Sequence, residues 1–280
     1  MEERRLTAAQ AAAFHDYLIF EEKSAATIEK YRRDVENFAR YVGDGAVTKE
    51  KVIAYKRDLQ ERYAAQSVNS MLASLNSLLS FLGWRDLRVR SLKLQQQAYC
   101  SEERELTKAE YVRLCRTAER RHNRRLFLIL QTICGTGVRV SELQYITLEA
   151  VRKGEAVVSC KAKTRTVFIV RKLKQKLLRY AAEQGIRSGM IFVTRSGRAI
   201  SRTNIWREMK ALCSMAGVNP GKVFPHNLRH LFARIFYGVE KDLAKLADVL
   251  GHSSINTTRI YIVSTGAEHK QCMENMHLIL

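Results

Sequence analysis

The chain has 280 residues, of which 46% are hydrophobic and only two are proline, which excludes a disordered polypeptide and leaves room for two modest helix-rich domains. It carries 48 Lys and Arg against 28 Asp and Glu, a formal net charge of +20, which indicates a polyanionic partner such as nucleic acid or an anionic membrane face. Residues 1–95 hold 16 basic and 13 acidic residues, and residues 96–280 hold 32 and 15. We therefore expect the C-terminal two thirds to make most phosphate contacts, unless the excess only solvates a basic surface.

The cysteines and the apolar runs point to a location inside the cell. The six cysteines are scattered without the two-residue spacing of a zinc or redox motif, so we expect reduced thiols. The N-terminus lacks the apolar segment of a signal peptide, and the longest apolar run, Leu126 to Cys134, is too short to span a bilayer. These features predict a cytoplasmic protein with no membrane partner, and the basic excess adds nucleoid association.

Residues 8–84 show the periodicity of four helices. The second is the clearest: Ser24 is a suitable N-cap, apolar side chains recur at helical spacing from Tyr31 to Val42, and Gly43 ends the run. The polar faces carry basic side chains that either follow a DNA backbone or are simply solvated. Residues 85–104 break the periodicity with a basic stretch, three glutamines and an acidic cluster, as expected of a linker. We predict a helical domain over 1–88, a linker over 89–104 and a second domain over 105–280.

The second domain is predicted to be mixed. Thr107 and Glu110 form a capping box for a helix that ends near 121, and a buried helix spans 123–134. Alternating patterns predict strands at 156–160 and 166–170 around a basic hairpin tip at 161–165, with another short strand near 190–193. Further helices are expected at about 171–185, 202–216, 225–237 and 240–249. The predicted fold class is mainly α with a small antiparallel β-sheet.

Three segments of the second domain hold residues suited to phosphate chemistry. In residues 135–143, two glycines allow a tight turn that delivers Arg139, and Glu142 can hold the arginine or the local backbone. At 225–230, Pro225 suits the first turn of a helix, which places His226 and Arg229 on one face. His230 is expected to point away from that face, as a packed or capping histidine. A guanidinium can donate a forked pair of hydrogen bonds to a phosphate, and an imidazole can move a proton.

The third segment contains a tyrosine that can act as a nucleophile. Leu250, Gly251 and His252 end a helix, and Tyr261 follows nine residues later on an expected short helix. A free phenol is a poor nucleophile at neutral pH, but two arginines would stabilise its anion and the phosphorane. Either hairpin lysine, Lys161 or Lys163, could protonate the departing 5′ oxygen. Each motif alone is more often structural; the ordered set predicts cutting and rejoining of DNA through a phosphotyrosine bond.

In this order the motifs resemble the tyrosine recombinases, or phage-type integrases, from about residue 8 to 265, in a two-domain form like the Xer recombinases. Residues 135–143 look like the first-arginine box of that family. Residues 225–233 and 250–254 match its second box, with Thr258 and Tyr261 in the places that this box gives them. Ser24, Thr27, Tyr31 and Asp34 resemble the family's SAM-like core-binding domain.

The resemblance implies roles for six residues. Arg139 and Arg229 become the phosphate clamp, Tyr261 the nucleophile, and His226 and His252 the proton-transfer and oxyanion-stabilising groups. Lys161 is the implied leaving-group acid. The hairpin tip is one residue shorter than the family's common form, so Lys163 stays an alternative. No cofactor and no metal are implied.

The resemblance also implies partners. These are double-stranded DNA recombination sites, a tetramer of this chain that passes through a Holliday junction, and an accessory DNA-bending or directionality protein. The apolar tail at 265–280 is expected to form a short helix that docks in trans, with docking on its own domain as the alternative. The rival functions are a type IB topoisomerase, which relaxes DNA as a monomer, and a catalytically silent DNA-binding regulator on the same fold.

Overall fold

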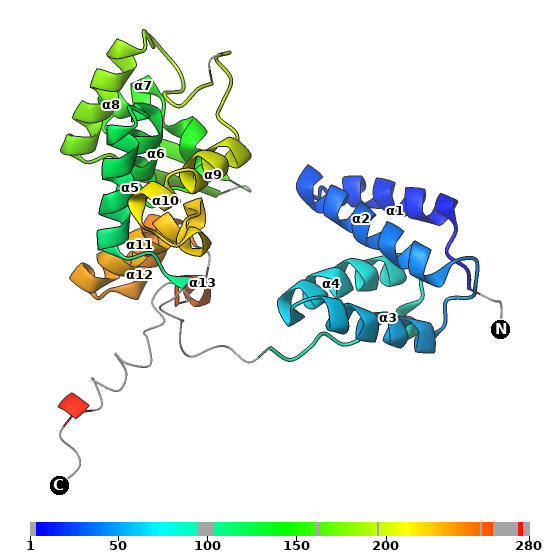
Figure 1. The fold of residues 1–280 in the computed structure, drawn as a ribbon. Coiled ribbons are helices and arrows are strands. Elements are labelled where there is room, and N and C mark those ends of the chain that lie inside the picture. Colours follow the sequence, from blue (N-terminus) through cyan, green and yellow to red (C-terminus); the bar gives the residue numbers. More distant parts are fainter. Residues whose placement is uncertain are drawn as a thin grey trace. The chain divides into compact units, whose positions relative to one another are not determined.

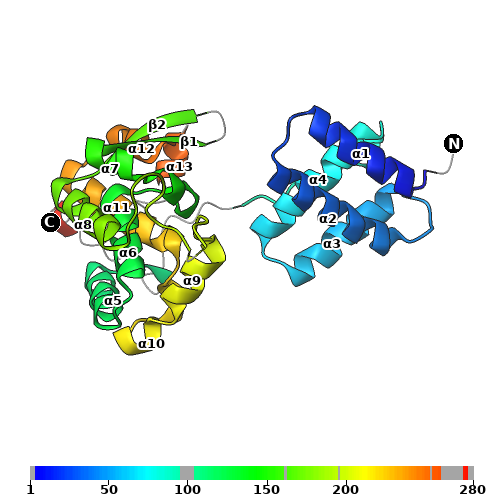
Figure 2. The same ribbon diagram turned by 90° about the horizontal axis from the view of Figure 1, so that it is seen from above.

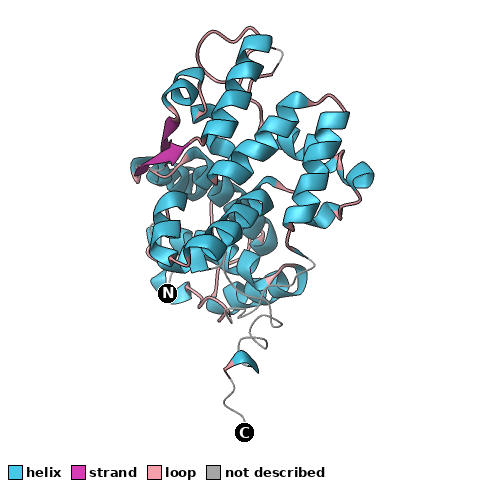
Figure 3. Cartoon of the chain, turned by 90° about the vertical axis from the view of Figure 1, so that its left-hand side faces the viewer, coloured by secondary structure: helices cyan, strands magenta, loops and turns pink. Residues whose placement is uncertain are grey.

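The computed structural model describes residues 4–94, 104–160, 163–194, 196–252, 254–259 and 274–276. The chain forms two compact units, Met1–Gln96 and Gln97–Leu280, and each is considered by itself (Figure 1). Within the described ranges no helix has the length and apolar character needed to cross a membrane. Helices dominate both units, and one β-hairpin supplies the sheet (Figure 3), which confirms the predicted fold class.

The N-terminal unit contains the four predicted helices α1 (Ala8–Phe20), α2 (Ala25–Val42), α3 (Lys49–Arg62) and α4 (Ala65–Phe81). The hydroxyls of Thr7, Ser24 and Thr48 accept hydrogen bonds from the first turns of α1, α2 and α3, which fixes where these helices begin. Their apolar stripes meet in one core that includes Phe14, Phe38, Val52, Leu59, Val68, Leu72, Leu78 and Leu79. The core therefore follows the stripes predicted from the sequence.

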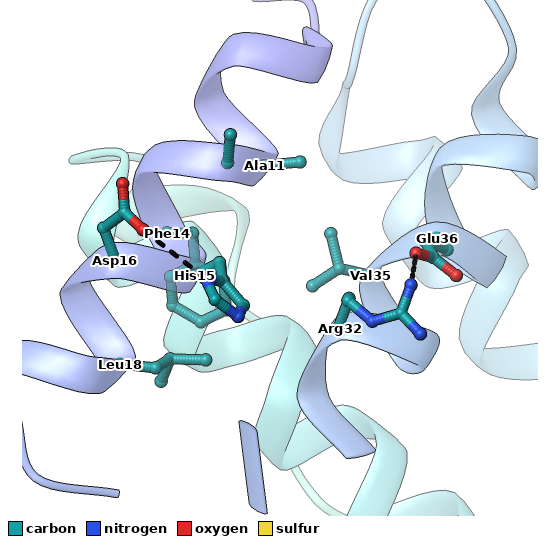
Figure 4. A pocket seen from close by; sticks show the side chains of 9 residues that line it. Ala11, Phe14, His15, Asp16, Leu18, Arg32, Val35 and Glu36 are labelled. Atoms are coloured by element: carbon teal, nitrogen blue, oxygen red, sulfur yellow. Dashed lines mark hydrogen bonds and ion pairs between the residues drawn. The ribbon is translucent and has the colours of Figure 1, made fainter. Parts of the chain in front are cut away.

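A pocket lies between α1 and α2 of this unit (Figure 4). Phe14, Leu18 and Val35 give it an apolar lining, and these three side chains belong to the core. Its rim carries two local polar pairs: Arg32 Nη1 lies 2.5 Å from Glu36 Oε1, and His15 Nδ1 lies 3.4 Å from Asp16 Oδ1. The charges at the rim are thus already paired within the unit.

Two asparagines of α4 hold the segment that leaves this unit. After the 3-10 turn η1 (Arg85–Leu87), the side-chain amide of Asn76 donates to the Val89 carbonyl at 2.8 Å and accepts from its N–H at 3.0 Å. Asn69 makes the same two bonds with Leu92, at 2.9 and 2.7 Å. Because 69 and 76 lie two helical turns apart, they share a face of α4. Residues 89–92, which the sequence assigned to the linker, therefore lie along this helix.

The C-terminal unit is built around α6 (Arg124–Thr136), whose residues Leu126, Leu128, Ile129, Leu130 and Ile133 are almost completely buried. The neighbouring helices α5 (Lys108–Arg120), α8 (Arg171–Glu183) and α11 (Pro225–Glu240) pack on it (Figure 2). Between α6 and α8 come the 3-10 helix η3 (Val140–Tyr145), α7 (Leu148–Lys153) and the strands β1 (Glu155–Cys160) and β2 (Lys163–Phe168). The remaining elements are α9 (Arg202–Lys210), α10 (Cys213–Ala216), η4 (Pro220–Lys222), α12 (Leu243–Leu250) and α13 (Ile255–Arg259).

The hairpin differs from the prediction. The strands pair antiparallel from Glu155 opposite Phe168 to Cys160 opposite Lys163, so the strand includes residues 163–165 that were expected in the tip. Along β2 the inward positions are Arg165 and Val167, while residues 164, 166 and 168 are exposed. An arginine at an inward position hides the alternation on which the strand prediction depended.

Three other local expectations were wrong. The helix expected over 202–216 is broken into α9 and α10 by Ala211 and Leu212. Residues 190–193 form isolated bridges, Met190 with Thr147 and Val193 with Ala199, rather than a strand. Gly135 continues α6, and only Gly137 turns the chain, in the left-handed conformation with a φ of 68°. A single glycine is sufficient there because it can cap the helix without strain.

Candidate active site

Arg139 is the N-cap residue of η3 and lies two residues after the turn at Gly137. Its backbone N–H donates to Glu142 Oε2 and its Nη1 donates to Glu142 Oε1, both at 2.7 Å. Glu142 thus holds both the arginine side chain and its backbone, as the sequence suggested. The Arg139 side chain keeps 37% of its surface exposed, so it remains accessible from solvent.

Glu142 is a buried carboxylate shared by several donors. Its side chain is only 2% exposed, and besides Arg139 it accepts from Arg165 Nη2 at 2.7 Å. Arg229 Nη1 lies 3.9 Å from the same Oε2 atom. Burial raises the pKa of Glu142, but the Arg139 backbone and side-chain hydrogen bonds and the charges of Arg165 and Arg139 outweigh it, so the pKa lies below its usual value. One ionised carboxylate therefore positions three guanidinium groups.

Arg229 lies in the first turns of α11, which starts at Pro225, and it is 1% exposed. Its Nη1 donates to the Gly137 carbonyl, and its Nη2 donates to the Leu250 carbonyl at 2.7 Å. Gly137 is the C-cap of α6, and Leu250 is the last residue of α12, so Arg229 joins the ends of these two helices. Burying a guanidinium is costly unless acceptors surround it, and these carbonyls meet that need.

His252 follows the left-handed C-cap Gly251 and contacts Arg229. Its Nε2 lies 3.0 Å from Arg229 Nη2, and its Nδ1 lies 2.8 Å from Oγ1 of Thr258, a buried residue of α13. A guanidinium has only donors, so Nε2 accepts and the neutral ring carries its proton on Nδ1. Burial lowers the pKa of His252 to about 4, helped by the charges of Arg229, Arg139 and Arg165.

His226 and His230 lie four residues apart on α11, and their rings meet edge to face with centroids 4.7 Å apart. The expectation that His230 points away was wrong, because positions i and i+4 share a helix face as i and i+3 do. Burial lowers the pKa of His226, with Arg229 and Arg139 contributing. Burial, then His226 and Arg229, lowers that of His230 to about 4. Both rings are therefore neutral at pH 7.

The structure thus brings Arg139, His226, Arg229 and His252 together. The predicted Lys161 and Tyr261 lie outside the described residues. Lys163 is the first residue of β2. Arg165 was not singled out from the sequence; the signal that could have found it is an arginine in the inward phase of a strand. No group of three His, Cys, Asp or Glu suited to a metal ion occurs in the described ranges.

The comparison with protein-family models decides the assignment. The model of the phage integrase family matches residues 104–268, and that of the N-terminal SAM-like domain of phage integrases matches residues 11–86. The chain belongs to the phage integrase family. The members of this family are tyrosine recombinases, so the chain is an enzyme of that class.

Relatives of this integrase chain include Xer recombinases. It is 26% identical to the tyrosine recombinase XerA of Pyrococcus furiosus. The alignment is 288 positions long, gaps included, and covers 100% of this chain and 98% of the relative. It is 28% identical to the tyrosine recombinase XerC of Erythrobacter litoralis over 267 residues, which cover 90% and 87%.

Solved structures share the fold. A crystal structure of XerA recombinase matches with a TM-score of 0.55 at 24% identity, covering 97% of this chain and 99% of that one. The XerH recombinase bound to its palindromic difH substrate matches with a TM-score of 0.70 at 18% identity, covering 88% and 78%. A lambda integrase tetramer bound to a Holliday junction matches with a TM-score of 0.73 at 17% identity, covering 92% and 77%.

Proposed function

We propose that this chain is a site-specific DNA recombinase that cuts and rejoins strands through a 3′-phosphotyrosyl bond at Tyr261, without metal or ATP. The observation that carries the proposal is the shared anchorage of Arg139 and Arg229. Glu142 bonds Arg139 and lies 3.9 Å from Arg229, and Arg229 in turn contacts His252. Two guanidinium groups and an imidazole held this closely form a binding site for one phosphodiester.

The proposed cleavage step is a transesterification. The Tyr261 oxygen attacks the scissile phosphorus, its proton passes to a nearby base, and the bond to the 5′ oxygen breaks. Arg139 and Arg229 neutralise the charge that develops on the non-bridging oxygens. Lys161, with Lys163 as the alternative, gives a proton to the departing oxygen. We assign proton transfer to His226 and oxyanion stabilisation to His252.

His252 must change its partner for that role. In the DNA-free structure its Nε2 accepts from Arg229, whereas a hydrogen bond to a phosphate oxygen requires a proton on Nε2. Insertion of a phosphate between the two side chains would replace this bond, and Thr258 Oγ1 can accept from or donate to Nδ1 in either tautomer.

Rejoining would reverse the chemistry with a different strand. The 5′ hydroxyl of the second duplex attacks the phosphotyrosine, which restores a phosphodiester and releases Tyr261. One ester bond is exchanged for another at each step, so no external energy source is needed. Two such exchanges make and resolve a Holliday junction, on which we place a tetramer of this chain bound to two recombination sites. The lambda integrase tetramer bound to a Holliday junction and the XerH recombinase bound to its difH substrate support this arrangement.

In this proposal the domain over 1–88 clamps the DNA, and the linker over 89–104 connects this domain to the catalytic domain over 105–280. The tail of the catalytic domain, residues 265–280, docks on a neighbouring subunit. The linker and tail fall largely outside the described residues. The excess of 32 basic over 15 acidic residues in 96–280 supports backbone contacts by the catalytic part. An accessory DNA-bending or directionality protein is a further proposed partner.

A suicide substrate tests the proposal. Duplexes that the full-length protein selects from a randomised pool are rebuilt with a nick just downstream of each candidate cut, so that the short 5′-hydroxyl fragment diffuses away. We expect a covalent protein–DNA adduct that persists in EDTA and is lost in Tyr261→Phe. Tyr237→Phe, at a tyrosine of α11 that packs against the cluster of Ala233, Leu246 and Leu250, is the matched control and should keep the adduct.

The same assay separates the rival functions. Absence of any adduct on bound duplexes would leave only a silent DNA-binding regulator. Relaxation of supercoils by a monomer, without joining of two duplexes, would identify a topoisomerase. Joined duplexes that appear together with the adduct are the result expected for a recombinase.

A further inference from the structure

Arg165 is a charged residue in an inward position of the β-hairpin. It pairs with Val158 in the sheet, and its side chain is 11% exposed. Its inward neighbours Val158 and Val167 are both buried apolar residues. A guanidinium in such a place needs a structural reason, because an uncompensated buried charge destabilises the fold.

The reason is a pair of hydrogen bonds to two other parts of the unit. Arg165 Nη2 donates to Glu142 Oε2, and Nη1 donates to the Val249 carbonyl, each at 2.7 Å. Glu142 is the carboxylate that also holds Arg139. Val249 lies in the last turn of α12, three residues before His252. Arg165 thus connects the hairpin to the elements that carry both of these candidate site residues.

Gly251 shows how closely the Arg165 side chain follows the end of α12. A Cβ atom added at Gly251 would lie 2.3 Å from Arg165 Cδ and 2.9 Å from Nε, which is closer than atoms can approach. Two features of the fold therefore require a glycine at position 251. It adopts a φ of 65°, and it leaves room for Arg165.

We infer that Arg165 is a positioning residue, which fixes the hairpin relative to Arg139 and His252. The inference rests on the proposed function, in which Lys161 or Lys163 of the same hairpin supplies the proton for the leaving group. Lys161 is four residues from Arg165, so the chain between them spans at most about 13 Å. An anchor this near sets where the hairpin tip can place an acid.

The role differs from a contact with DNA. Arg165 donates from Nη1 to the Val249 carbonyl and from Nη2 to Glu142. Arg229 differs, because its Nη2 also contacts His252, and in the proposed function a phosphate replaces that contact. Loss of Arg165 should therefore leave DNA affinity almost unchanged and slow the chemical step. Misplacement of reacting groups by about 1 Å can cost on the order of 100-fold in rate.

The test compares two variants of Arg165 in the full-length protein. Arg165→Lys keeps the charge but cannot fork to both acceptors, and Arg165→Met keeps the length but loses both bonds. On the nicked suicide duplex under single-turnover conditions we expect cleavage to slow about 10-fold in the lysine variant and about 100-fold in the methionine variant. Duplex affinity should stay within about 3-fold for both.

Arg125 provides a matched control, because it lies at the N-terminal end of α6 and the candidate site lies beside the C-terminal end. Like Arg165, it is partly buried and donates to one carbonyl and one carboxylate. Its Nη1 donates to the Val193 carbonyl at 3.2 Å, and its Nη2 donates to Glu208 at 2.7 Å. Arg125→Lys should lower the unfolding midpoint as Arg165→Lys does, without slowing cleavage. If the matched lysine variants cleave equally fast, Arg165 has no positioning role. If the unaltered protein forms no adduct at all, it is the proposed function that fails.

Discussion

Glu142 is the residue on which the candidate site most depends. It accepts hydrogen bonds from Arg139 and Arg165 and lies beside Arg229, in a position almost closed to solvent. A buried carboxylate that compensates several buried cations cannot be removed without leaving those cations uncompensated. Loss of Glu142 should therefore disturb the positions of all three arginines.

Glu142→Gln should lower the free energy of unfolding by about 3 kcal/mol, since it keeps the volume but removes the charge. The control is Glu155→Gln, which breaks only the surface ion pair with Lys153 and should cost less than about 1 kcal/mol. Urea unfolding at pH 7.5 measures both. Equal losses in the two variants would contradict the central place given to Glu142.

Histidine burial predicts a pH dependence of stability. The folded protein holds His230 and His252 with a pKa of about 4, and that of His226 is also lowered, whereas unfolded histidines titrate near 6.5. Below pH 6.5 the unfolded chain thus binds more protons, and the free energy of unfolding should fall as the pH drops from about 6.5 towards 4. The lowered pKa of Glu142 gives a stabilisation that is present at neutral pH and is lost only in more acidic solution, so the histidines account for the decline between pH 6.5 and 5.

Urea unfolding between pH 7.5 and 5 checks this sign. His230→Asn should flatten the decline, and Asn37→Leu, which removes no titratable group, should leave it unchanged. Stability that rises towards pH 5 would show that these three rings are protonated in the folded protein.

At the scale of elements, the segment 89–92 is held by two asparagines of α4. The side-chain amide of Asn76 bonds both the N–H and the carbonyl of Val89, and that of Asn69 bonds both groups of Leu92, as a neighbouring backbone would. A hydrogen bond of this kind contributes about 1 kcal/mol net. Together they keep the start of the interdomain segment against the N-terminal core.

The double variant Asn69→Leu, Asn76→Leu should accelerate amide exchange at Val89 and Leu92 by at least about 10-fold, since opening no longer breaks the side-chain bonds. Exchange in the middle of α4 should change little. Asn37→Leu, at a side chain bonded only to Arg40 on the surface of α2, is the control. Unchanged exchange at Val89 would show that the asparagines do not hold the segment.

The sequence predicted the helices better than the turns, for physical reasons. Ser24 and Thr107 predict helix starts because their hydroxyls can cap backbone N–H groups, and both caps are present in the structure. The hairpin was misjudged because Arg165 breaks the apolar alternation, and its partners Glu142 and Val249 are distant in sequence. Contacts of this kind follow from the tertiary fold and leave no local pattern.

At the scale of the whole molecule, family membership joins two units that the sequence had already separated by charge and periodicity. Residues 1–95 and 96–280 differ in basic excess, and the two family models match residues 11–86 and 104–268. Of the six predicted site residues the structure gathers Arg139, His226, Arg229 and His252. The nucleophile and the leaving-group acid stay predictions, because Tyr261 and Lys161 lie outside the described residues.

The most direct test of the central claim is to identify the residue that joins the DNA. The adduct from the suicide duplex is digested with nuclease and trypsin, and the peptide that carries the nucleotide remnant is sequenced by mass spectrometry. Cleavage after Arg259 and Lys270 releases residues 260–270, whose single tyrosine is Tyr261. We predict a 3′-phosphotyrosyl remnant on this peptide. A remnant on any peptide that lacks Tyr261 would contradict the account.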